Sequence, residues 1–348
     1  MAEADPQNDL LAPAPPWLLE PLLALLGSQD SLHHGLLLSG PPGIGKGAFA
    51  RQLAASLLCE APGADGLACR QCASCQWMLQ LQHPDLRLIM PESLDPQFVP
   101  SGSKKPSREI KIEQVRELAG FMAVGAHRGG WRIVIIDPAE AMNGITANGL
   151  LKTLEEPGPQ TLLLLVSSHD DRLPATIRSR CRRVPLRAPD EADALQWLLA
   201  AGAPDEDTAR RALRAAGSPM HALVFIEPAE QAAHQSILET LAALPDTADM
   251  KAVDALDRHD PKQWAGVLQR WIADLARVLA GLEPHYYPQM AGRMAQLAPA
   301  TDLDRVTRLQ TALVTLEARI NHPLNTRLLC ESSVLAYCKV FGAGRSNR

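Results

Sequence analysis

The chain has 348 residues, of which 46% are hydrophobic and 21% are charged, and its formal net charge is −5 at pH 7. This length predicts two or three domains, each large enough to have its own core. The net acidity argues against a uniformly basic nucleic-acid-binding surface, so any DNA contact is expected to be local or made alongside other proteins. No apolar run approaches the roughly 20 residues that span a bilayer, and the first residues lack the pattern of a signal peptide. We therefore expect a cytoplasmic protein that does not contact a membrane.

A glycine-rich loop from Gly40 to Lys46 follows the apolar run Leu36 to Leu38 and precedes a predicted helix over residues 48–58. This is the spacing of a P-loop, in which backbone N–H groups and the positive end of the helix surround a phosphate and the lysine reaches its outer oxygens. The next position normally supplies a hydroxyl group to magnesium, but here it is Gly47, which has no side chain to hold a metal. The candidate phosphate-binding residues are Gly40, Gly43, Gly45 and Lys46.

Four cysteines follow the P-loop helix with the spacing C-x9-C-x2-C-x2-C. Cysteines of a cytoplasmic protein are expected to be reduced, so a tight group of them indicates a metal site rather than disulfides. Four thiolates complete the tetrahedral shell of Zn²⁺ and leave no position for water, which predicts a structural site. His83 is an alternative ligand, although a structural role is the simpler interpretation for it. The predicted zinc ligands are Cys59, Cys69, Cys72 and Cys75.

Near-continuous apolar segments alternate with segments of helical periodicity up to about residue 166. This pattern predicts a parallel sheet with helices on both faces, and therefore an α/β domain. One predicted strand ends in Asp137, where P-loop ATPases carry an acid that orients magnesium or its water. The next residue in such enzymes is a catalytic glutamate, but here it is Pro138, which cannot act as a base. Beyond the P-loop strand, the predicted strands are Leu86–Met90, Trp131–Asp137 and Thr161–Val166, and the predicted helices cover 112–122 and 146–156.

The rest of the chain is predicted to be helical. Residues 185–189 begin and end with proline and are predicted to form a domain junction, and no strand is assigned between Val166 and this junction. Three short helices are predicted over residues 191–201, 205–216 and 220–226, which is enough for a small lid. Apolar stripes over 264–279 and 306–320 then predict the core of a helical bundle.

Five stretches together resemble the delta-prime subunits of bacterial DNA polymerase III clamp loaders, which belong to the AAA+ superfamily. The resemblance implies an AAA+ α/β domain over 1–187 with a zinc module at 59–75, a helical lid over 188–228, and an all-helical oligomerisation collar over 229–348. The collar agrees with the family in length and class only. The stretches that carry the resemblance are GPPGIGK at 40–46, the four-cysteine group, HPD at 83–85, ANGLLKTLEEP at 147–157 and LPATIRSRC at 173–181.

Ser179, Arg180 and Cys181 resemble the family's SRC motif, whose arginine reaches into the ATP site of the adjacent subunit. A guanidinium is always charged and can meet two phosphate oxygens that gain charge during transfer. Such arginine fingers raise the rate about 10³- to 10⁵-fold. The resemblance therefore implies a catalytic role in trans for Arg180. A solvated or interface charge is at least as good an interpretation for the neighbouring Arg178, Arg182, Arg183 and Arg187.

The sequence departs from the ATP-hydrolysing relatives at three positions. Gly47 lacks the metal-binding hydroxyl, Pro138 replaces the catalytic acid, and Met220 aligns with the phosphate-sensing arginine of the lid. Because each change removes a step of the same reaction, we expect a subunit that does not hydrolyse ATP. Lys46 and the intact glycines still permit weak nucleotide or phosphate binding, and the alternative is a loop retained for structure alone.

The resemblance implies a scaffold subunit whose partners are ATPase subunits of the gamma/tau type and a delta-type subunit. Through that complex it would act on the sliding clamp and on primed DNA, with ATP bound by the neighbouring subunit. No catalysis is expected of the isolated chain, and the activity of a DNA-directed DNA polymerase would belong to the holoenzyme. Two alternatives remain open, namely an ATP-hydrolysing motor subunit and a stand-alone zinc-dependent nucleic-acid-binding module.

Overall fold

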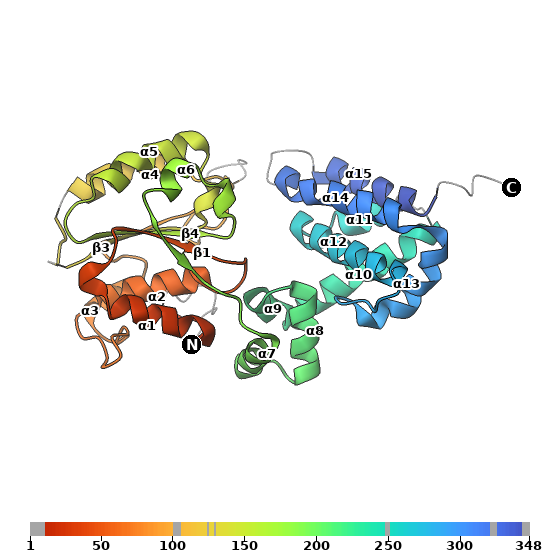
Figure 1. Ribbon diagram of the computed structural model, residues 1–348, viewed down its shortest axis with the longest axis horizontal. Coiled ribbons are helices and arrows are strands. Elements are labelled where there is room, and N and C mark those ends of the chain that lie inside the picture. Colours follow the sequence, from red (N-terminus) through yellow and green to blue (C-terminus); the bar gives the residue numbers. More distant parts are fainter. Residues whose placement is uncertain are drawn as a thin grey trace. The chain divides into compact units, whose positions relative to one another are not determined.

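The computed structural model describes residues 11–99, 106–123, 125–128, 130–247, 251–320 and 326–342. The chain divides into two compact units, Met1–Asp193 and Ala194–Arg348 (Figure 1). The first is an α/β unit and the second is helical in its described residues. Within the part of the chain that the structure describes, no helix has both the length and the apolar character needed to cross a membrane.

A five-stranded parallel sheet lies at the centre of the first unit, with the strand order β2-β3-β4-β1-β5. The P-loop strand β1 lies between β4 and β5, so that Leu37 is opposite both Leu165 and Arg183. Every residue of β1, β3 and β4 is buried, as the near-continuous apolar sequences predict for a sheet covered on both faces. The strands are β1 (Gly35–Ser39), β2 (Leu86–Ile89), β3 (Arg132–Ile136), β4 (Thr161–Ser167) and β5 (Arg182–Pro185).

The edge strand β5 corrects the sequence prediction, which assigned no strand between Val166 and the domain junction. It pairs only with β1, and Arg182, Arg183 and Pro185 are exposed while Val184 is half-buried. The strand therefore has no run of buried apolar residues by which it could be recognised. Charges and a terminal proline are typical of an edge strand, because they discourage pairing with another chain.

Helices cover both faces of the sheet, as predicted for the α/β unit. Figure 1 shows α1, α2 and α3 on one face and α4, α5 and α6 on the other, and each face has its own apolar cluster. The side chain of Asn143 caps the start of α5 by accepting a hydrogen bond from the amide of Thr146 at 3.0 Å. The helices are α1 (Leu19–Leu26), α2 (Lys46–Leu58), α3 (Ala73–Leu79), α4 (Ile112–Ala123), α5 (Gly144–Glu155) and α6 (Ala175–Arg178), with 3-10 turns at Pro16–Leu18, Gln29–Ser31, Ala139–Ala141 and Asp170–Arg172.

The second unit begins within the three helices that were predicted as a lid. The carboxylate of Asp205 accepts a hydrogen bond from the amide of Thr208 at 2.7 Å and caps α8, and Gly217 ends α8 with a φ of 75°. These helices share a small core of leucine and alanine side chains. The helices are α7 (Glu191–Ala200), α8 (Glu206–Ala216), α9 (Pro219–Phe225), α10 (Pro228–Thr247), α11 (Lys251–Leu256), α12 (Pro261–Leu279), α13 (Ala291–Leu297), α14 (Leu303–Ile320) and α15 (Thr326–Val340), with 3-10 turns at Pro288–Met290 and Ala298–Ala300.

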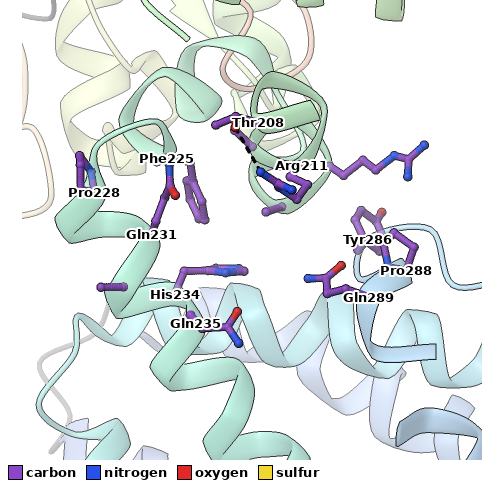
Figure 2. A pocket seen from close by; sticks show the side chains of 14 residues that line it. Thr208, Arg211, Phe225, Pro228, Gln231, His234, Gln235, Tyr286, Pro288 and Gln289 are labelled. Carbon is purple, nitrogen blue, oxygen red and sulfur yellow. Dashed lines mark hydrogen bonds between the residues drawn. The ribbon is translucent and has the colours of Figure 1, made fainter. Parts of the chain in front are cut away.

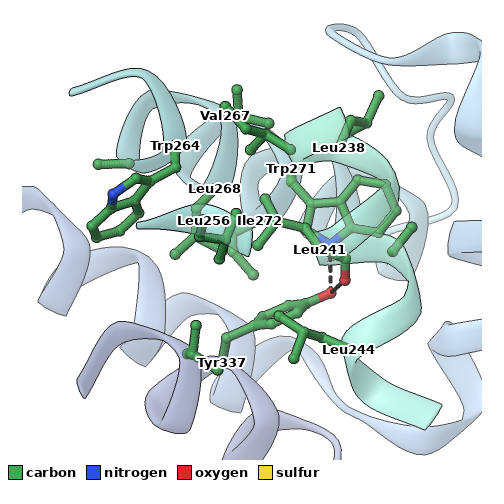
Figure 3. Packing of buried hydrophobic residues seen from close by; sticks show 14 of the residues in the cluster. Leu238, Leu241, Leu244, Leu256, Trp264, Val267, Leu268, Trp271, Ile272 and Tyr337 are labelled. Carbon is green, nitrogen blue, oxygen red and sulfur yellow. Dashed lines mark hydrogen bonds between the residues drawn. The ribbon is translucent and has the colours of Figure 1, made fainter. Parts of the chain in front are cut away.

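Two tryptophans and a tyrosine lie in the core of the predicted collar (Figure 3). The indole N–H of Trp271 donates to the hydroxyl of Tyr337 at 2.7 Å, and that hydroxyl donates to the carbonyl of Leu241 at 3.1 Å. These bonds satisfy the polar groups of buried aromatic side chains. The predicted stripe of α12 is confirmed, since Trp264, Trp271 and their apolar neighbours are buried. Val306, Leu309 and Leu313 of the α14 stripe are also buried, whereas the side chains of residues 315–320 lie outside the described part.

Candidate functional site

The P-loop joins β1 to α2, and its glycines have identifiable geometric roles. Gly43 and Gly45 have φ angles of 68° and 94°, which side chains disfavour. A Cβ on Gly40 would overlap the carbonyl oxygen of Leu186. The loop therefore keeps the backbone path that the sequence spacing predicts.

Lys46 is 5% exposed, and its ammonium group binds the loop itself. Nζ donates to the carbonyls of Gly40 at 2.9 Å and Pro41 at 2.6 Å, and to Oγ of Ser168 at 2.9 Å. Burial lowers the pKa of Lys46, while the nearby carboxylates of Glu140 and Asp137 counteract that shift. The lysine thus ties the P-loop to the end of β4.

Gly47 occupies the position where a P-loop ATPase carries a metal-binding hydroxyl. A Cβ at this position would lie 2.5 Å from Oδ2 of Asp137 and 3.2 Å from Nη1 of Arg51. A real Cβ does not come within 3 Å of a heavy atom without a shift in one of them. The carboxylate of Asp137 and the guanidinium of Arg51 therefore already fill the space in which a hydroxyl would hold a metal.

The electrostatics around Asp137 agree with this arrangement. Burial raises the pKa of Asp137 to about 6, the guanidinium of Arg51 acts in the opposite direction, and the carboxylate of Glu140 raises it further. One carboxylate oxygen of Glu140 accepts from the amide of Ser168 at 2.9 Å. The acidic groups at this site are thus balanced by Arg51 and Lys46, two cations of the chain itself.

Residues that precede the first helix cover the start of the P-loop helix. A Cβ on Gly45 would lie 2.6 Å from Cγ of Pro15, and the indole N–H of Trp17 donates to the carbonyl of Ile44 at 2.9 Å. The amide of Ala14 donates to the side chain of Gln52. The glycine at position 45 is therefore required both by its own φ and by the close approach of Pro15.

Arg180 follows the short helix α6 and is held at the surface of the first unit. Its side chain is 36% exposed and forms an ion pair with Glu155 at 2.6 Å, through Nη2 and Oε1. Nε donates to the same carboxylate at 2.8 Å, and Nη1 donates to the carbonyl of Thr176 at 3.0 Å. Glu155 is the last residue of α5, so the predicted finger residue is oriented by the segment that contains the LKTLEEP sequence.

The four predicted zinc ligands meet directly after α2, and all four sulfur atoms lie within 4.8 Å of one another. Three pairs of these sulfur atoms lie 3.8, 3.9 and 4.0 Å apart. In a tetrahedral site with Zn–S bonds of about 2.3 Å, the sulfur atoms lie about 3.8 Å apart. The geometry thus fits a metal of that size. The cluster consists of Cys59, Cys69, Cys72 and Cys75.

Backbone amides point at these sulfur atoms. The amide of Cys69 donates to Sγ of Cys59 at 3.3 Å, and the amide of Cys72 donates to Sγ of Cys69 at 3.3 Å. The amide of Cys75 donates to Sγ of Cys72 at 3.5 Å. Amide hydrogen bonds lower the pKa of Cys69 to about 6, whereas burial raises the pKa of Cys75. Donors of this kind favour thiolates, the form in which cysteine binds a metal.

Comparison with known proteins shows that the first unit is similar to DNA polymerase III subunits. A family model described as DNA polymerase III, delta subunit, matches residues 20–190. The DNA polymerase III subunit delta' of Pseudomonas aeruginosa is 43% identical over 186 residues, which are 53% of this chain and 52% of that protein. These residues are similar to the delta-prime subunits of DNA polymerase III. The resemblance that the sequence motifs indicated is confirmed for this part of the chain.

Other delta-prime proteins match the same part of the chain. The subunit delta' of Escherichia coli is 35% identical over 185 residues, covering 53% of this chain and 52% of that protein. The chain thus spans about half the length of the curated relatives it matches. A DNA polymerase III gamma-subunit-related protein of Thermotoga maritima superposes with a TM-score of 0.40 at 18% identity, covering 93% of this chain and 99% of that one. A score this low adds no weight to a functional assignment.

The HPD segment at residues 83–85 has a structural role. Nε2 of His83 lies 2.8 Å from Oγ of Ser74, which donates to the carbonyl of Leu58 at 2.6 Å. The amide of Asp85 donates to Nδ1 of His83 at 3.1 Å, so the neutral ring carries its proton on Nε2. His83 therefore joins the cysteine segment to β2 through Ser74 and is not part of the sulfur cluster.

Sequence reasoning missed the residues that fill and orient these sites. Arg51 lies outside every motif, and Glu155 lies in the ANGLLKTLEEP stretch but had no assigned role, because each acts on a partner brought near only by the fold. Arg183 was left open between a solvated and an interface charge; it forms an ion pair with Asp170 at 2.8 Å and donates to Oγ of Ser39 at 3.1 Å. The one available signal was Gly47, since a glycine after the P-loop lysine implies that something else occupies the space.

Proposed function

We propose that this chain is a non-hydrolysing subunit of the DNA polymerase III clamp loader that supplies Arg180 to the ATP site of a neighbouring subunit. In this role its partners are gamma/tau-type and delta-type subunits, and the assembled complex loads the sliding clamp on primed DNA. Proteins named delta', gamma and tau subunits of DNA polymerase III are among its relatives. The helical second unit would serve as the collar that joins the subunits.

The position of Arg180 is the observation that carries this proposal. Its guanidinium is at the surface of the first unit, where the carboxylate of Glu155, the carbonyl of Thr176 and the hydroxyl of Ser179 orient it. A guanidinium in this setting keeps N–H donors available for phosphate oxygens. Had the side chain been buried among its own core residues, it would be out of reach of a neighbouring nucleotide.

The side chains that occupy the P-loop support the proposal that this chain does not hydrolyse ATP. Asp137 and Arg51 occupy the space of the metal-binding side chain at Gly47, and Lys46 is bonded to its own loop. ATP hydrolysis at such a site requires a metal bridging the phosphates and a residue that positions the attacking water. Neither Gly47 nor Pro138 can supply these functions. The interpretation of the P-loop as a retained structural loop is therefore better supported than nucleotide binding.

The cysteine cluster is proposed to hold a structural zinc ion. Its sulfur spacing and its amide donors suit tetrahedral Zn²⁺, and four thiolates leave no open position for water. Bound there, the ion would stiffen the segment between α2 and β2 and would have no part in catalysis.

Substitution of Arg180 tests the proposed finger. In a clamp loader reconstituted from all its subunits, Arg180→Ala should leave assembly intact and reduce clamp-stimulated ATP hydrolysis at least severalfold, toward the 10³-fold expected for an arginine finger. Arg182→Ala is the matched control, because Arg182 is exposed, lies two residues away and should not change the rate. Glu155→Ala should reduce the rate less than Arg180→Ala, since it removes only the group that orients the guanidinium. An unchanged rate with Arg180→Ala would remove the proposed role.

The isolated chain separates this proposal from its two alternatives. A motor subunit would hydrolyse ATP alone, and its turnover would be abolished by Lys46→Ala. A stand-alone nucleic-acid-binding module would bind DNA without partners, with an affinity that falls steeply with salt. The proposal expects neither activity from the purified chain.

A further inference from the structure

A cavity of about 440 Å³ lies within the second unit, between α8, α10 and the segment that follows α12 (Figure 2). Figure 2 shows Arg211, His234 and Gln289 facing one another around this hollow, with Phe225 and Tyr286 at its sides. Cavities of roughly 300–1,000 Å³ are the usual size of small-molecule sites. Neither the sequence motifs nor the proposed arginine finger assigns a role to this cavity.

The charge of the cavity favours an anion. Arg211 and Arg214 both line it, and none of the described residues that line it is acidic. Nη2 of Arg211 donates to Oγ1 of Thr208 at 3.1 Å, which fixes the guanidinium and leaves its other N–H groups for a ligand. The neighbouring Arg210 is instead paired with Glu206 on the same helix. Both lining arginines belong to α8, and they give this wall of the cavity a positive charge.

His234 adds a polar group to the lining of the cavity. Its side chain is 9% exposed and lines the cavity, and Nε2 lies 3.3 Å from the hydroxyl of Tyr287. Nε of Arg270 donates to the same hydroxyl at 3.4 Å, so the tyrosine proton is directed to Nε2 and the neutral ring carries its proton on Nδ1. Among the residues that the structure describes, Nδ1 has no hydrogen-bond partner. This nitrogen is not one of the buried polar atoms that lack a partner, so it is open to the cavity, where a ligand could accept from it.

The other lining groups suit a flat ring. The ring of Phe225 meets that of His234 edge to face, with centroids 4.8 Å apart, and Tyr286 adds a third ring to the lining. Aromatic side chains of this kind stack on nucleobases. The side-chain amides of Gln231, Gln235 and Gln289 can donate and accept hydrogen bonds at the edge of a base.

We propose that this cavity binds a nucleoside phosphate, with Arg211 and Arg214 on the phosphate and the aromatic side chains against the base. The site is built entirely from the second unit and is separate from the P-loop. The inference does not depend on the proposed arginine finger. A ligand held there would contact both α8 and α10, and so would brace the predicted lid against the predicted collar.

Calorimetric titration of the full-length chain with AMP, ADP, adenosine and inorganic phosphate tests the site, with EDTA present to exclude metal-dependent binding. AMP or ADP should bind at least about tenfold more tightly than adenosine or phosphate alone, because both halves of the ligand are recognised. Arg211→Gln and Arg214→Gln should each weaken that binding about tenfold or more, as expected for hydrogen bonds to a charged group. The matched control is Arg210→Gln, on the same helix but not lining the cavity, which should change the affinity less than about twofold.

Three results would overturn the assignment. The first is no heat of binding with either nucleotide at millimolar concentration. The second is equal affinity for nucleotide and inorganic phosphate, which would exclude recognition of a base. The third is an affinity that survives Arg211→Gln and Arg214→Gln but is lost in Lys46→Ala, which would place the nucleotide in the P-loop.

Discussion

The P-loop and the four-cysteine cluster lie at the two ends of α2 and differ in how their ligand positions are filled. At the P-loop, side chains of the chain itself occupy the space, with Asp137 and Arg51 beside Gly47 and Lys46 turned onto the loop. At the cysteine cluster, four sulfur atoms converge on a point, and the only groups that donate to them are backbone amides and neighbouring thiols. The first arrangement is filled by side chains of the chain itself, although one buried oxygen of Glu140 has no partner among the described residues, and the second is arranged as a ligand shell.

The contrast shows why a motif and a site have to be judged separately. The glycines of the P-loop are still required, because Gly40 and Gly45 are approached closely by Leu186 and Pro15. A loop can thus keep its sequence pattern for packing reasons after its ligand chemistry has been lost. The cysteine spacing has no comparable packing explanation, since converging thiols gain little from one another without a metal. The predictions below test this difference, beginning with the largest expected effect.

Loss of one cysteine ligand should have the largest effect. Cys72→Ser should reduce the zinc content from about one ion per chain to near zero and lower the free energy of unfolding by about 5 kcal/mol or more, since structural zinc binding contributes about 10–16 kcal/mol in small modules. Elemental analysis and denaturant unfolding measure the two effects. Cys338→Ser is the control, because this half-buried cysteine lies in α15, outside the cluster. A folded wild-type chain that contains no metal would contradict the proposed site.

A side chain at position 47 should be less damaging but still unfavourable. Gly47→Ser places a Cβ against Asp137 and Arg51, whose side-chain ends can shift, and we expect a loss of about 1–3 kcal/mol, the range for overpacking. The loss should be smaller in an Arg51→Ala background, where space has been made, and unfolding of the four variants measures this coupling. Gly120→Ser in α4 is the matched control, because a Cβ there meets nothing within 4 Å. Equal stability of Gly47→Ser and wild type would show that the P-loop space is open.

The buried acid of the P-loop should make stability depend on pH. The pKa of Asp137 is raised to about 6 from an ordinary value of 3.8, so its favourable contribution is present below pH 3.8 and is lost as the pH rises through 6. Asp137→Asn should therefore stabilise the chain at pH 8. The shift corresponds to at most about 3 kcal/mol with the attraction to Arg51 already included. A buried asparagine amide also needs hydrogen-bond partners, so we expect a gain of about 1–2 kcal/mol. Unfolding of both proteins between pH 4 and pH 8 should show the gain disappearing toward pH 4.

Much of the α/β unit could be predicted because its signals are local. Runs such as that of β4 are apolar throughout since both faces of the sheet are covered, and the cysteine ligands follow a fixed spacing. The edge strand β5 was missed because its residues are exposed on one side and two of them are arginines. The side chains that lie beside Gly47 could not be predicted for another reason. Arg51 lies one helical turn after Gly47 in α2, but Asp137 is far away in the sequence, and only the fold brings it to the same place.

The smallest predicted effect concerns the segment that covers the P-loop helix. Trp17→Phe keeps an aromatic ring but removes the 2.9 Å hydrogen bond from the indole N–H to the carbonyl of Ile44. We expect a loss of about 1 kcal/mol, the usual net value of such a bond, with no change in zinc content. Thermal unfolding and elemental analysis of the same samples measure both quantities. If Trp17→Phe reduced the zinc content as well, the two ends of α2 would be coupled, and the P-loop would have to be regarded as part of the support of the cysteine cluster.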